Sequence, residues 1–430
     1  MDEQALNIIQ ITLDEMEEEL LADISLEEMA ARRGYSPWHF ARLFQRIVGM
    51  PVMQYRTRRR LIHALYAIGN GAGITETALL YGFDTHAGFF KAFHQAYGCS
   101  PTEYLSRHKV PSPHSLILKE EKYPMISNSQ WKQALARWNI SLPLSPVVFP
   151  GSGRIHESRK YAGEAYILKA FTDYGKCNSQ AKLSKFLYAC HLPAELPVET
   201  PQGEIIIESN NLYYLLSQAI PGAPLRASEL LSDDIQGNGK SIGTALGNLH
   251  QALDKMEDCP ITDRQDFLGM LQGWALPRVK ALNILDEKWM RTYEEKITAL
   301  FPHLPRGLIH RDPNPSNLIK TKDGAIGFID FDLAENNIRL YDPCYAATAV
   351  LSECFEEKEK WPAFYQGMID GYAACFPMTG EERAAAPLMT LGIEMICIAS
   401  FSDIRKYQDI LNTNIQMLQW LKDLPELKMQ

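Results

Sequence analysis

The segment from residue 308 to residue 332 constrains this chain of 430 residues more than any other part of its sequence. It contains the runs LIHRDPNPSNLI (308–319) and IGFIDFD (326–332), in which polar residues are bracketed by short apolar stretches. An aspartate on a loop, an asparagine five residues later and an aspartate after the next strand supply the oxygen atoms that Mg²⁺-dependent phosphoryl transfer needs. The spacing therefore predicts that Asp312 accepts the proton of a hydroxyl group or orients the acceptor molecule. It also predicts that Asn317 and Asp330 hold Mg²⁺.

Residues 151–171, further upstream, have a sequence pattern that is typical of a phosphate-binding sheet. Gly151 and Gly153 form a predicted turn before a strand-like run, residues 165–171, that carries Lys169. Glycines followed by a strand with one lysine suit phosphate binding. A buried strand that ends in a lysine is also common, so this pattern has an ordinary structural interpretation as well.

These motifs together resemble the aminoglycoside phosphotransferase and choline kinase group over roughly residues 147–400. The likeness also rests on YLLSQAIPG (214–222), similar to the hinge of that group, on LGNLH (246–250), and on Asp342-Pro343 after the metal motif. The resemblance implies an α+β, protein-kinase-like fold with two lobes that phosphorylates small molecules with ATP or GTP and Mg²⁺. The sequence has no segment like the A-P-E of protein kinases, which argues against a protein kinase.

The same resemblance implies roles for further residues. Lys169 would contact the nucleotide phosphates, Ser217 and Ala219 would offer backbone groups to the adenine, and His310 would brace the catalytic loop. Lysine in this role is usually positioned by a carboxylate from a nearby helix.

Two departures from the family pattern leave the activity open. The helix expected at residues 178–191 contains no Asp or Glu to pair with the lysine, and Arg311 stands where small-molecule kinases more often have glycine. The region is therefore interpreted either as an active phosphotransferase or as a domain that only senses a nucleotide or small ligand. A simple kinase whose N-terminal block is a docking module is a third interpretation.

Charge is distributed unevenly along the chain. The net charge is −9, but residues 25–110 carry eleven basic and five acidic residues, whereas residues 1–24 carry eight acidic and no basic residues. A local charge of +6 within an acidic protein suits a polyanion such as DNA. The acidic start is interpreted as a solvated first helix, with an autoinhibitory role as the alternative.

The basic block, residues 25–110, contains the same helix-turn-helix sequence pattern twice. Ser25 with Glu28 three residues later predicts a capped helix, Gly34 predicts the turn, and a second helix follows. About fifty residues later a helix from Ile74 breaks at Gly82, and another follows. A connecting helix over residues 55–68 would set the separation of the two units.

The block also resembles the AraC/XylS regulator domain over about a hundred residues, on GYS (34–36), YGF (81–83), GCSP (98–101) and two Phe-x-x-x-Phe pairs (40/44 and 89/93). That resemblance implies that the second helix of each unit enters the major groove of double-stranded DNA. Its expected base contacts are Trp38, His39 and Arg42 in the first unit and Thr85, His86 and Lys91 in the second. Its expected phosphate contacts are Arg46, Arg58 and Arg59.

Each of these DNA-contact assignments has a structural alternative. An arginine on a helix often lies on a solvated face, Trp38 is equally suited to a core, and the two histidines could cap or pack. A helical bundle that binds no DNA is the alternative for the block as a whole.

The predicted fold class is a multidomain chain: an all-α DNA-binding domain with two helix-turn-helix units (1–109), a linker with a docking helix (110–145), and a two-lobe kinase-like domain (146–430, N-lobe 146–220, C-lobe 221–430). At 46% apolar residues the chain can bury several cores. Eight scattered cysteines without a C-x-x-C pair indicate buried thiols rather than zinc or disulfides.

Partners and location follow from the same features. No apolar run is long enough to span a membrane and the N-terminus lacks a signal pattern, so a cytoplasmic protein without a membrane partner is expected. The expected partners are DNA, a nucleotide and an unknown small-molecule acceptor, and a homodimer is an open option. Glu394, Asp403 and Tyr407 are acceptor-contact candidates, with a structural role as the alternative for each.

Overall fold

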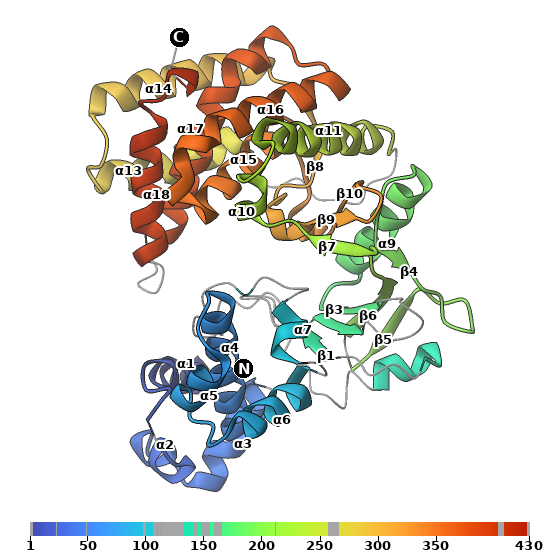
Figure 1. Ribbon diagram of the computed structural model, residues 1–430, viewed down its shortest axis with the longest axis vertical. Coiled ribbons are helices and arrows are strands. Elements are labelled where there is room, and N and C mark those ends of the chain that lie inside the picture. The colour runs from blue at the N-terminus through green and yellow to red at the C-terminus, as the bar shows by residue number, and fades with distance from the viewer. Residues whose placement is uncertain are drawn as a thin grey trace. The chain divides into compact units, whose positions relative to one another are not determined.

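The computed structural model describes residues 3–22, 24–48, 50–97, 100–105, 110, 113, 133–140, 145–147, 155–158, 166–210, 212–256, 266–402 and 408–427. A helical N-terminal part precedes a mixed part of sheets and helices (Figure 1), which confirms the predicted fold class. The chain divides into two compact units, residues 1–181 with 196–219 and residues 182–195 with 220–430. The finer domain boundaries given above stay a prediction.

Two helix-turn-helix units form where the sequence places them. The helices are α1 (Glu3–Glu18), α2 (Leu26–Arg32), α3 (Pro37–Val48), α4 (Val52–Gly69), α5 (Ile74–Leu80), α6 (His86–Tyr97) and α7 (Pro101–Leu105). Ser25 and Glu28 form the reciprocal capping box at α2. Gly34 and Gly82 have φ of 72° and 77°, the left-handed conformation that glycine adopts without a steric penalty.

Each unit has its own apolar core. In the first core, Ile9 and Leu13 of α1 pack with Phe40 and Phe44 of α3. The second core forms from α4 to α7 around Phe89 and Phe93. Helix α4 contributes to both cores, which matches its predicted role as the connection between the units.

The N-lobe is an antiparallel sheet with one main helix. Its elements are β1 (Ser145–Val147), β2 (Ile155–Ser158), β3 (Tyr166–Phe171), α9 (Tyr174–Ala189), β4 (Leu196–Pro197), β5 (Ile206–Ser209) and β6 (Leu212–Gln218), with the strand order β1-β2-β3-β6-β4 and β5 also paired to β6. A short 3₁₀ turn, η1 (Ala136–Trp138), lies at the end of the predicted docking helix, of which residues 130–132 lie outside the described residues.

The C-lobe is mainly helical. Its elements are β7 (Gly222–Pro224), α10 (Ala227–Leu230), α11 (Ile235–Leu253), α12 (Phe267–Met270), the π-helical turn η2 (Leu271–Ala275), α13 (Leu276–Ala281), α14 (Glu287–Leu300), η3 (Phe301–His303), β8 (Arg306–Ile309), η4 (Pro315–Asn317), β9 (Leu318–Thr321), β10 (Ile326–Phe328), η5 (Phe331–Leu333), β11 (Glu335–Ile338), α15 (Tyr341–Glu353), η6 (Phe355–Lys360), α16 (Trp361–Cys375), α17 (Gly380–Phe401), α18 (Gln408–Leu421) and η8 (Pro425–Leu427).

Helices α11 and α16 run side by side at short distance (Figure 1). Gly243 of α11 lies so near α16 that a Cβ would clash with the carbonyl oxygen of Met368, and a Cβ on Gly371 would clash with that of Lys240. This close approach fixes α11, which carries the buried His250 at its C-terminal end.

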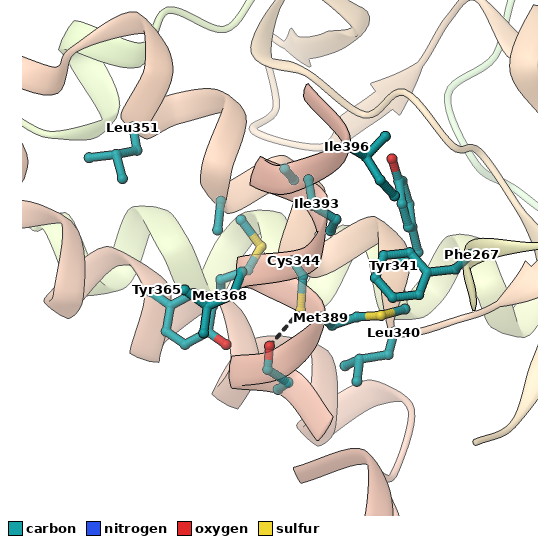
Figure 2. Packing of buried hydrophobic residues seen from close by; sticks show 14 of the residues in the cluster. Phe267, Leu340, Tyr341, Cys344, Leu351, Tyr365, Met368, Met389, Ile393 and Ile396 are labelled. Carbon is teal, nitrogen blue, oxygen red and sulfur yellow. Dashed lines mark hydrogen bonds between the residues drawn. The ribbon is translucent and has the colours of Figure 1, made fainter. Parts of the chain in front are cut away.

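The C-lobe core lies between α15, α16 and α17. Cys344 of α15, Tyr365 and Met368 of α16 and Met389 and Ile393 of α17 gather there, and the Cys344 thiol donates to the Ala386 carbonyl at 3.7 Å (Figure 2). By length and composition α17 could cross a membrane, but 72% of its apolar window is buried. The described free cysteines are buried or half-buried, as expected for thiols in a core.

Candidate functional site

The catalytic-loop motif lies on the connections between short C-lobe strands. Strand β8 ends at Ile309, and the loop that follows carries Asp312 and leads through η4 to Asn317. Strand β10 then ends just before Asp330, so that the two hairpin ends bring the motif residues together. The amide of Ile329 donates to the carbonyl of Asn317 at 3.1 Å, which links the two ends directly.

Asp312 is held by side chains from three places. Its Oδ1 accepts hydrogen bonds from Asn314 Nδ2 at 2.9 Å and from the hydroxyl of Tyr345 on α15 at 2.8 Å. The Nδ2 of Asn317 donates to the Asp312 carbonyl at 2.9 Å and to its Oδ2 at 3.2 Å. The side-chain nitrogen of Asn317 therefore bonds within the loop, and its side-chain oxygen is the atom that could bind a cation.

The charges around this loop also fit a cation. Burial raises the pKa of the Asp312 carboxyl, the hydrogen bonds from Asn314 and Tyr345 oppose that rise, and the negative charge of Asp330 adds to it. Two carboxylates close enough to repel each other, with an amide oxygen beside them, are the hard oxygen donors that Mg²⁺ prefers. Asp330 itself has φ 64° and ψ 63°, an uncommon left-handed conformation for a residue with a side chain.

Asp342 of α15 holds the start of the loop through hydrogen bonds. This fully buried carboxylate accepts from the backbone amides of His310 at 2.8 Å and Arg311 at 2.9 Å, and it bonds His250 Nε2 at 2.9 Å. Burial alone would raise the pKa of Asp342, but its hydrogen bond with His250, the electrostatic effect of His250 and His310, and the hydrogen bond from the Arg311 amide hold it below its usual value. The Nδ1 of His250 in turn meets the hydroxyl of Tyr372 at 2.8 Å.

His310 braces the loop as the resemblance implies. It is completely buried, its Nε2 lies 2.9 Å from the carbonyl oxygen of Ile329, and its Nδ1 accepts from the amide of Asp312 at 3.3 Å. Its ring also packs on Phe331, with 4.4 Å between the ring centroids. The histidine thus connects Asp312 to the strand end that precedes Asp330.

Arg311 adopts a conformation that explains the family preference for glycine. Its φ is 76°, where an L-residue is strained and glycine is not. Its guanidinium lies 3.2 Å from Glu335 Oε1 and 4.1 Å from the centre of the Tyr341 ring. The departure noted in the sequence is therefore accommodated by specific side-chain contacts.

The expected nucleotide residues share one part of the N-lobe sheet. Lys169 on β3 pairs with Leu215 of β6, and Ser217 lies two residues further along β6, so both side chains lie on the same face of the sheet. Ser217 is buried and Ala219 is half-buried. Gly151 and Gly153 lie outside the described residues.

Helix α9 covers that same face without offering a carboxylate. Cys177 and Ala181 of α9 pack on Leu215, the residue opposite Lys169. No Asp or Glu occurs between residues 174 and 189, and Gln180 is a buried polar side chain of this helix. Helix α9 itself therefore carries no carboxylate.

Helix α3 presents an exposed polar and aromatic face. The Trp38 side chain is 67% exposed, and the Arg42 guanidinium lies 4.5 Å from the centre of its ring. His39 stacks on Tyr35 with centroids 5.1 Å apart. With Leu43 and Gln45 these residues line a hollow of about 500 Å³, so Trp38 is a surface residue and not part of the core.

Helix α6 presents a comparable face in the second unit. The hydroxyl of Thr85 accepts from the amide of Gly88 at 3.0 Å and so caps the helix. His86 and Lys91 are exposed, and the His86 ring packs on Phe90 with centroids 4.4 Å apart. Thr85 and His86 therefore lie at the exposed N-terminal end of this helix, and Lys91 lies further along its exposed surface.

One of the three expected phosphate contacts is corrected by the structure. Arg59 forms an ion pair with Glu17 of α1, with Nε to Oε2 at 2.8 Å and side chains only 11% and 15% exposed. His63 reaches the same carboxylate at 2.5 Å. Arg59 is thus engaged inside the domain, because the acidic first helix packs against α4 and takes up its charge.

The remaining arginines of α4 have mixed environments. Arg56 donates to the carbonyl of Ile24 at 2.9 Å and Arg60 to that of Leu20 at 2.9 Å, so both hold the end of the first helical segment. Arg58 is half-buried beside Tyr97. The side chain of Arg46 lies outside the described residues, and the roles of Arg46 and Arg58 stay predictions.

Of the three acceptor-contact candidates, the structure describes only Glu394. Glu394 of α17 is fully buried, its Oε2 has no hydrogen-bond partner among the described residues, and burial raises the pKa of its carboxyl to about 8. Those properties describe a neutral carboxylic acid in the core at neutral pH. Asp403 and Tyr407 lie outside the described residues.

Several residues at the site were not identified from the sequence. Tyr345 and Asn314 bond Asp312, Glu335 pairs with Arg311, and Tyr372 completes the chain from Asp342 through His250. The only available signal was proximity in sequence for Asn314, which lies inside the motif. The others come from separate elements and become neighbours only in the fold.

Comparison with known proteins assigns both parts of the chain. Residues 29–107 match a helix-turn-helix domain family and residues 152–387 match the phosphotransferase enzyme family, which accounts for more than half of the chain. The HTH-type transcriptional activator AarP of Providencia stuartii is 36% identical over 27% of this chain and 85% of its own length. Both resemblances stated from the motifs are confirmed.

Relatives of the C-terminal part are kinases. A homoserine kinase of Phenylobacterium zucineum is 37% identical over 63% of this chain and 83% of its own length. The chain covers 64% of the length of a homoserine kinase from Rhizobium etli, at 28% identity. The solved structure of an amicoumacin kinase in complex with AMP-PNP, Ca²⁺ and a further ligand, Ami, has the same fold at 13% identity, with a TM-score of 0.50 over 70% of this chain and 96% of that chain.

Proposed function

The chain belongs to the phosphotransferase enzyme family and carries an AraC-type helix-turn-helix transcription-regulator domain at its N-terminus. From this premise we propose that the C-terminal domain transfers the γ-phosphoryl group of ATP to an alcohol group of a small molecule. We further propose that α3 and α6 read DNA, so that one chain combines a phosphotransferase with a regulator of transcription.

The observation that carries the enzymatic proposal is the oxygen set at the catalytic loop. Asp312 and Asp330 interact electrostatically, and Asn317 has its amide nitrogen bonded to the Asp312 carbonyl. These donors fit a divalent cation. When bound, Mg²⁺ would neutralise charge on the transferring phosphoryl group, and Asn317 and Asp330 are the residues that would hold it.

Asp312 has the geometry of the group that orients the acceptor. The acceptor hydroxyl would donate to its carboxylate, the hydroxyl oxygen would form the new bond to the γ-phosphorus, and the bond to the β-phosphate oxygen would break to release ADP. The hydroxyl proton would pass to Asp312, whose pKa is raised by burial and is thereby better matched to a base near neutral pH. Tyr345 and Asn314 would keep the carboxylate oriented.

The nucleotide would bind through the N-lobe sheet. Lys169 would contact the phosphates, and the strand end at Ser217 and Ala219 would offer backbone groups to the base, by family resemblance. Gly151 and Gly153 complete this proposal from the sequence alone. Either ATP or GTP is compatible with backbone contacts of this kind.

The acceptor is proposed to be a small hydroxylated molecule. The kinship with proteins named homoserine kinases makes homoserine the first compound to test, followed by an aminoglycoside and choline. The amicoumacin kinase shares only the fold and carries no argument about the acceptor.

DNA reading is proposed for the two exposed helix faces. Trp38, His39 and Arg42 on α3 and Thr85, His86 and Lys91 at α6 combine exposure with hydrogen-bond donors and rings that suit base edges and thymine methyl groups. Arg46 and Arg58 are proposed as phosphate contacts. Selection of bound sequences from a random duplex pool by the full chain tests this part.

A second candidate function is a sensor that binds nucleotide or a small ligand without turnover. It is favoured by α9, which offers no carboxylate to pair with Lys169. In the family pattern a carboxylate from this helix helps to position the lysine, and a helix that does not supply it would lower the rate of transfer more than the affinity for nucleotide.

One experiment separates the two candidates. Calorimetric titration of the full chain with ATP and Mg²⁺ is compared with Asp330→Ala and with Asp323→Ala, an exposed carboxylate on the nearby β9–β10 turn. Hydrolysis of ATP is then followed in the same samples. Magnesium-dependent binding lost only in Asp330→Ala, with turnover in the wild type, supports the kinase. Binding without turnover supports the sensor, and no binding contradicts both.

A further inference from the structure

We propose that Arg311 is a positioning residue that fixes Asp312 for catalysis, in place of the glycine that the sequence comparison leads one to expect. The inference rests on the proposed phosphotransferase function of the same site. Its basis is a closed ring of contacts that starts and ends at the catalytic loop.

The backbone of Arg311 provides the first observation. With φ at 76°, the residue occupies a region that disfavours any residue with a Cβ. Its amide donates to Asp342 Oδ1 at 2.9 Å, and the next residue is Asp312. A strained conformation directly before the catalytic group persists only when contacts from elsewhere hold it.

The side chain of Arg311 supplies such contacts. Its Nε lies 3.2 Å from Glu335 Oε1, and its NH2 nitrogen lies 3.2 Å from Met270 Sδ. The Glu335 side chain is only 2% exposed and also accepts from Asn337 Nδ2 at 2.7 Å. Because Glu335 lies on β11 opposite Ile309 of β8, the ion pair ties the loop to the strand pair from which it emerges.

An aromatic path leads back to the carboxylate. The guanidinium of Arg311 lies 4.1 Å from the centre of the Tyr341 ring. Tyr341 stacks on Tyr345 one helical turn later, with centroids 5.6 Å apart and planes 16° apart, and the Tyr345 hydroxyl bonds Asp312 Oδ1 at 2.8 Å. Arg311 thus constrains Asp312 twice, through the backbone and through the two stacked tyrosines.

The variant Arg311→Gly separates positioning from folding. Glycine accepts the left-handed backbone but removes the ion pair and the cover of Tyr341. We expect kcat to fall at least about tenfold while KM for ATP changes less than about twofold, since a misplaced catalytic group affects the transfer step. Tyr345→Phe, which removes the hydroxyl that bonds Asp312 Oδ1, should show the same split between kcat and KM for ATP.

Arg339→Met is the matched control. Arg339 has the same arrangement away from the loop, an ion pair with the buried Glu382 and a guanidinium 4.1 Å from the centre of the Phe376 ring. Its loss should lower thermal stability and leave kcat per folded molecule and KM for ATP unchanged. Glu335→Gln, which keeps the side-chain shape, should reproduce the kcat effect of Arg311→Gly in a milder form.

The double variant Arg311→Gly with Tyr345→Phe completes the test. If both residues act along one path, its kcat should be close to that of the more affected single variant. Wild-type kcat in Arg311→Gly would overturn the proposal, as would a fall in kcat per folded molecule equal to that in Arg339→Met.

A wild type without turnover would contradict the proposed function instead. The positioning would then be read from hydrogen exchange of the amides of residues 310–319. Faster exchange in Arg311→Gly but not in Arg339→Met supports it, and equal exchange in the two variants overturns it.

Discussion

The catalytic loop and the α3 face are opposite solutions to the placement of polar side chains. In the loop, Asp312 and Asp342 are buried and already bonded to neighbours from several elements. On α3, Trp38 and Arg42 lie on the surface and contact mainly each other. Phosphoryl transfer depends on catalytic groups that are already positioned before the substrate binds. A DNA-reading helix instead keeps its hydrogen-bonding groups available for the base edges of the DNA.

The comparison predicts that substitutions in the loop change rate and stability, and that substitutions on α3 change binding alone. The largest effect is expected at the catalytic carboxylate. Asp312→Asn keeps the shape but cannot take up the hydroxyl proton, so kcat should fall by about 10²–10⁴-fold. Steady-state kinetics on the full chain with the best acceptor measures this, with Asp323→Asn as the exposed control. Wild-type kcat in Asp312→Asn would assign the proton to another group.

Asp342→Asn should destabilise the protein more than any surface change. In either orientation the NH2 group of the asparagine would face one of the two backbone N–H groups that donate to Asp342, and disrupting a buried charge pair typically costs about 3–5 kcal/mol. Thermal unfolding compared with Asp370→Asn, an exposed aspartate on α16, measures the difference. Equal melting temperatures of the two variants would contradict the role of Asp342 as the organiser of the loop.

The variant Glu394→Gln should become increasingly more stable than the wild type as the pH rises. The carboxyl has a pKa of about 8 in the fold against a usual value of 4.5. A carboxyl with a raised folded pKa favours the fold most below pH 4.5, and that advantage is lost between pH 4.5 and 8. Each pKa unit corresponds to about 1.4 kcal/mol, so the gain in Glu394→Gln at pH 8 should reach a few kcal/mol. Unfolding midpoints measured from pH 5 to pH 8.5 would contradict this if both proteins had the same slope.

Two arginines of the DNA-binding domain give the smallest effects and the sharpest contrast. Arg42→Ala should weaken sequence-specific DNA binding by about 1–3 kcal/mol and leave unfolding unchanged. Arg59→Met should lower unfolding stability by about 1–3 kcal/mol through the loss of its bond to Glu17, with DNA affinity per folded molecule retained. Titration of a labelled operator duplex together with thermal unfolding measures both, and a DNA-binding loss in Arg59→Met would restore its expected phosphate role.

The sequence predicted the elements that local rules control. The capping box at Ser25, the glycine turn at Gly34 and the order of residues in the catalytic loop depend on neighbours a few positions away, and the structure has them as expected. The partners of the loop were not predictable in the same way. Tyr345 lies 33 residues from Asp312 in the sequence, and His250 lies 92 residues from Asp342, through which it acts on the loop.

Charge was the least predictable property of individual residues. The excess of basic residues between 25 and 110 was evident, but it could not show that Arg59 is neutralised by Glu17, 42 residues earlier. The sequence suited Trp38 equally to a DNA contact and to a core, and the packing leaves its side chain exposed. Exposure and pairing depend on which distant surfaces meet, and a linear pattern does not contain that information.

By itself, the sequence determined which chemical groups this protein has, their local spacing and the two families to which its halves are related. Only the tertiary structure decided which of those groups are free to meet a partner. The physical reason is that hydrogen-bond spacing and helix periodicity are local, whereas desolvation and ion pairing depend on every segment that packs around a side chain. Arg42 and Arg59 are the same residue type in the same domain, and their surroundings alone place one on the surface and the other in an internal ion pair.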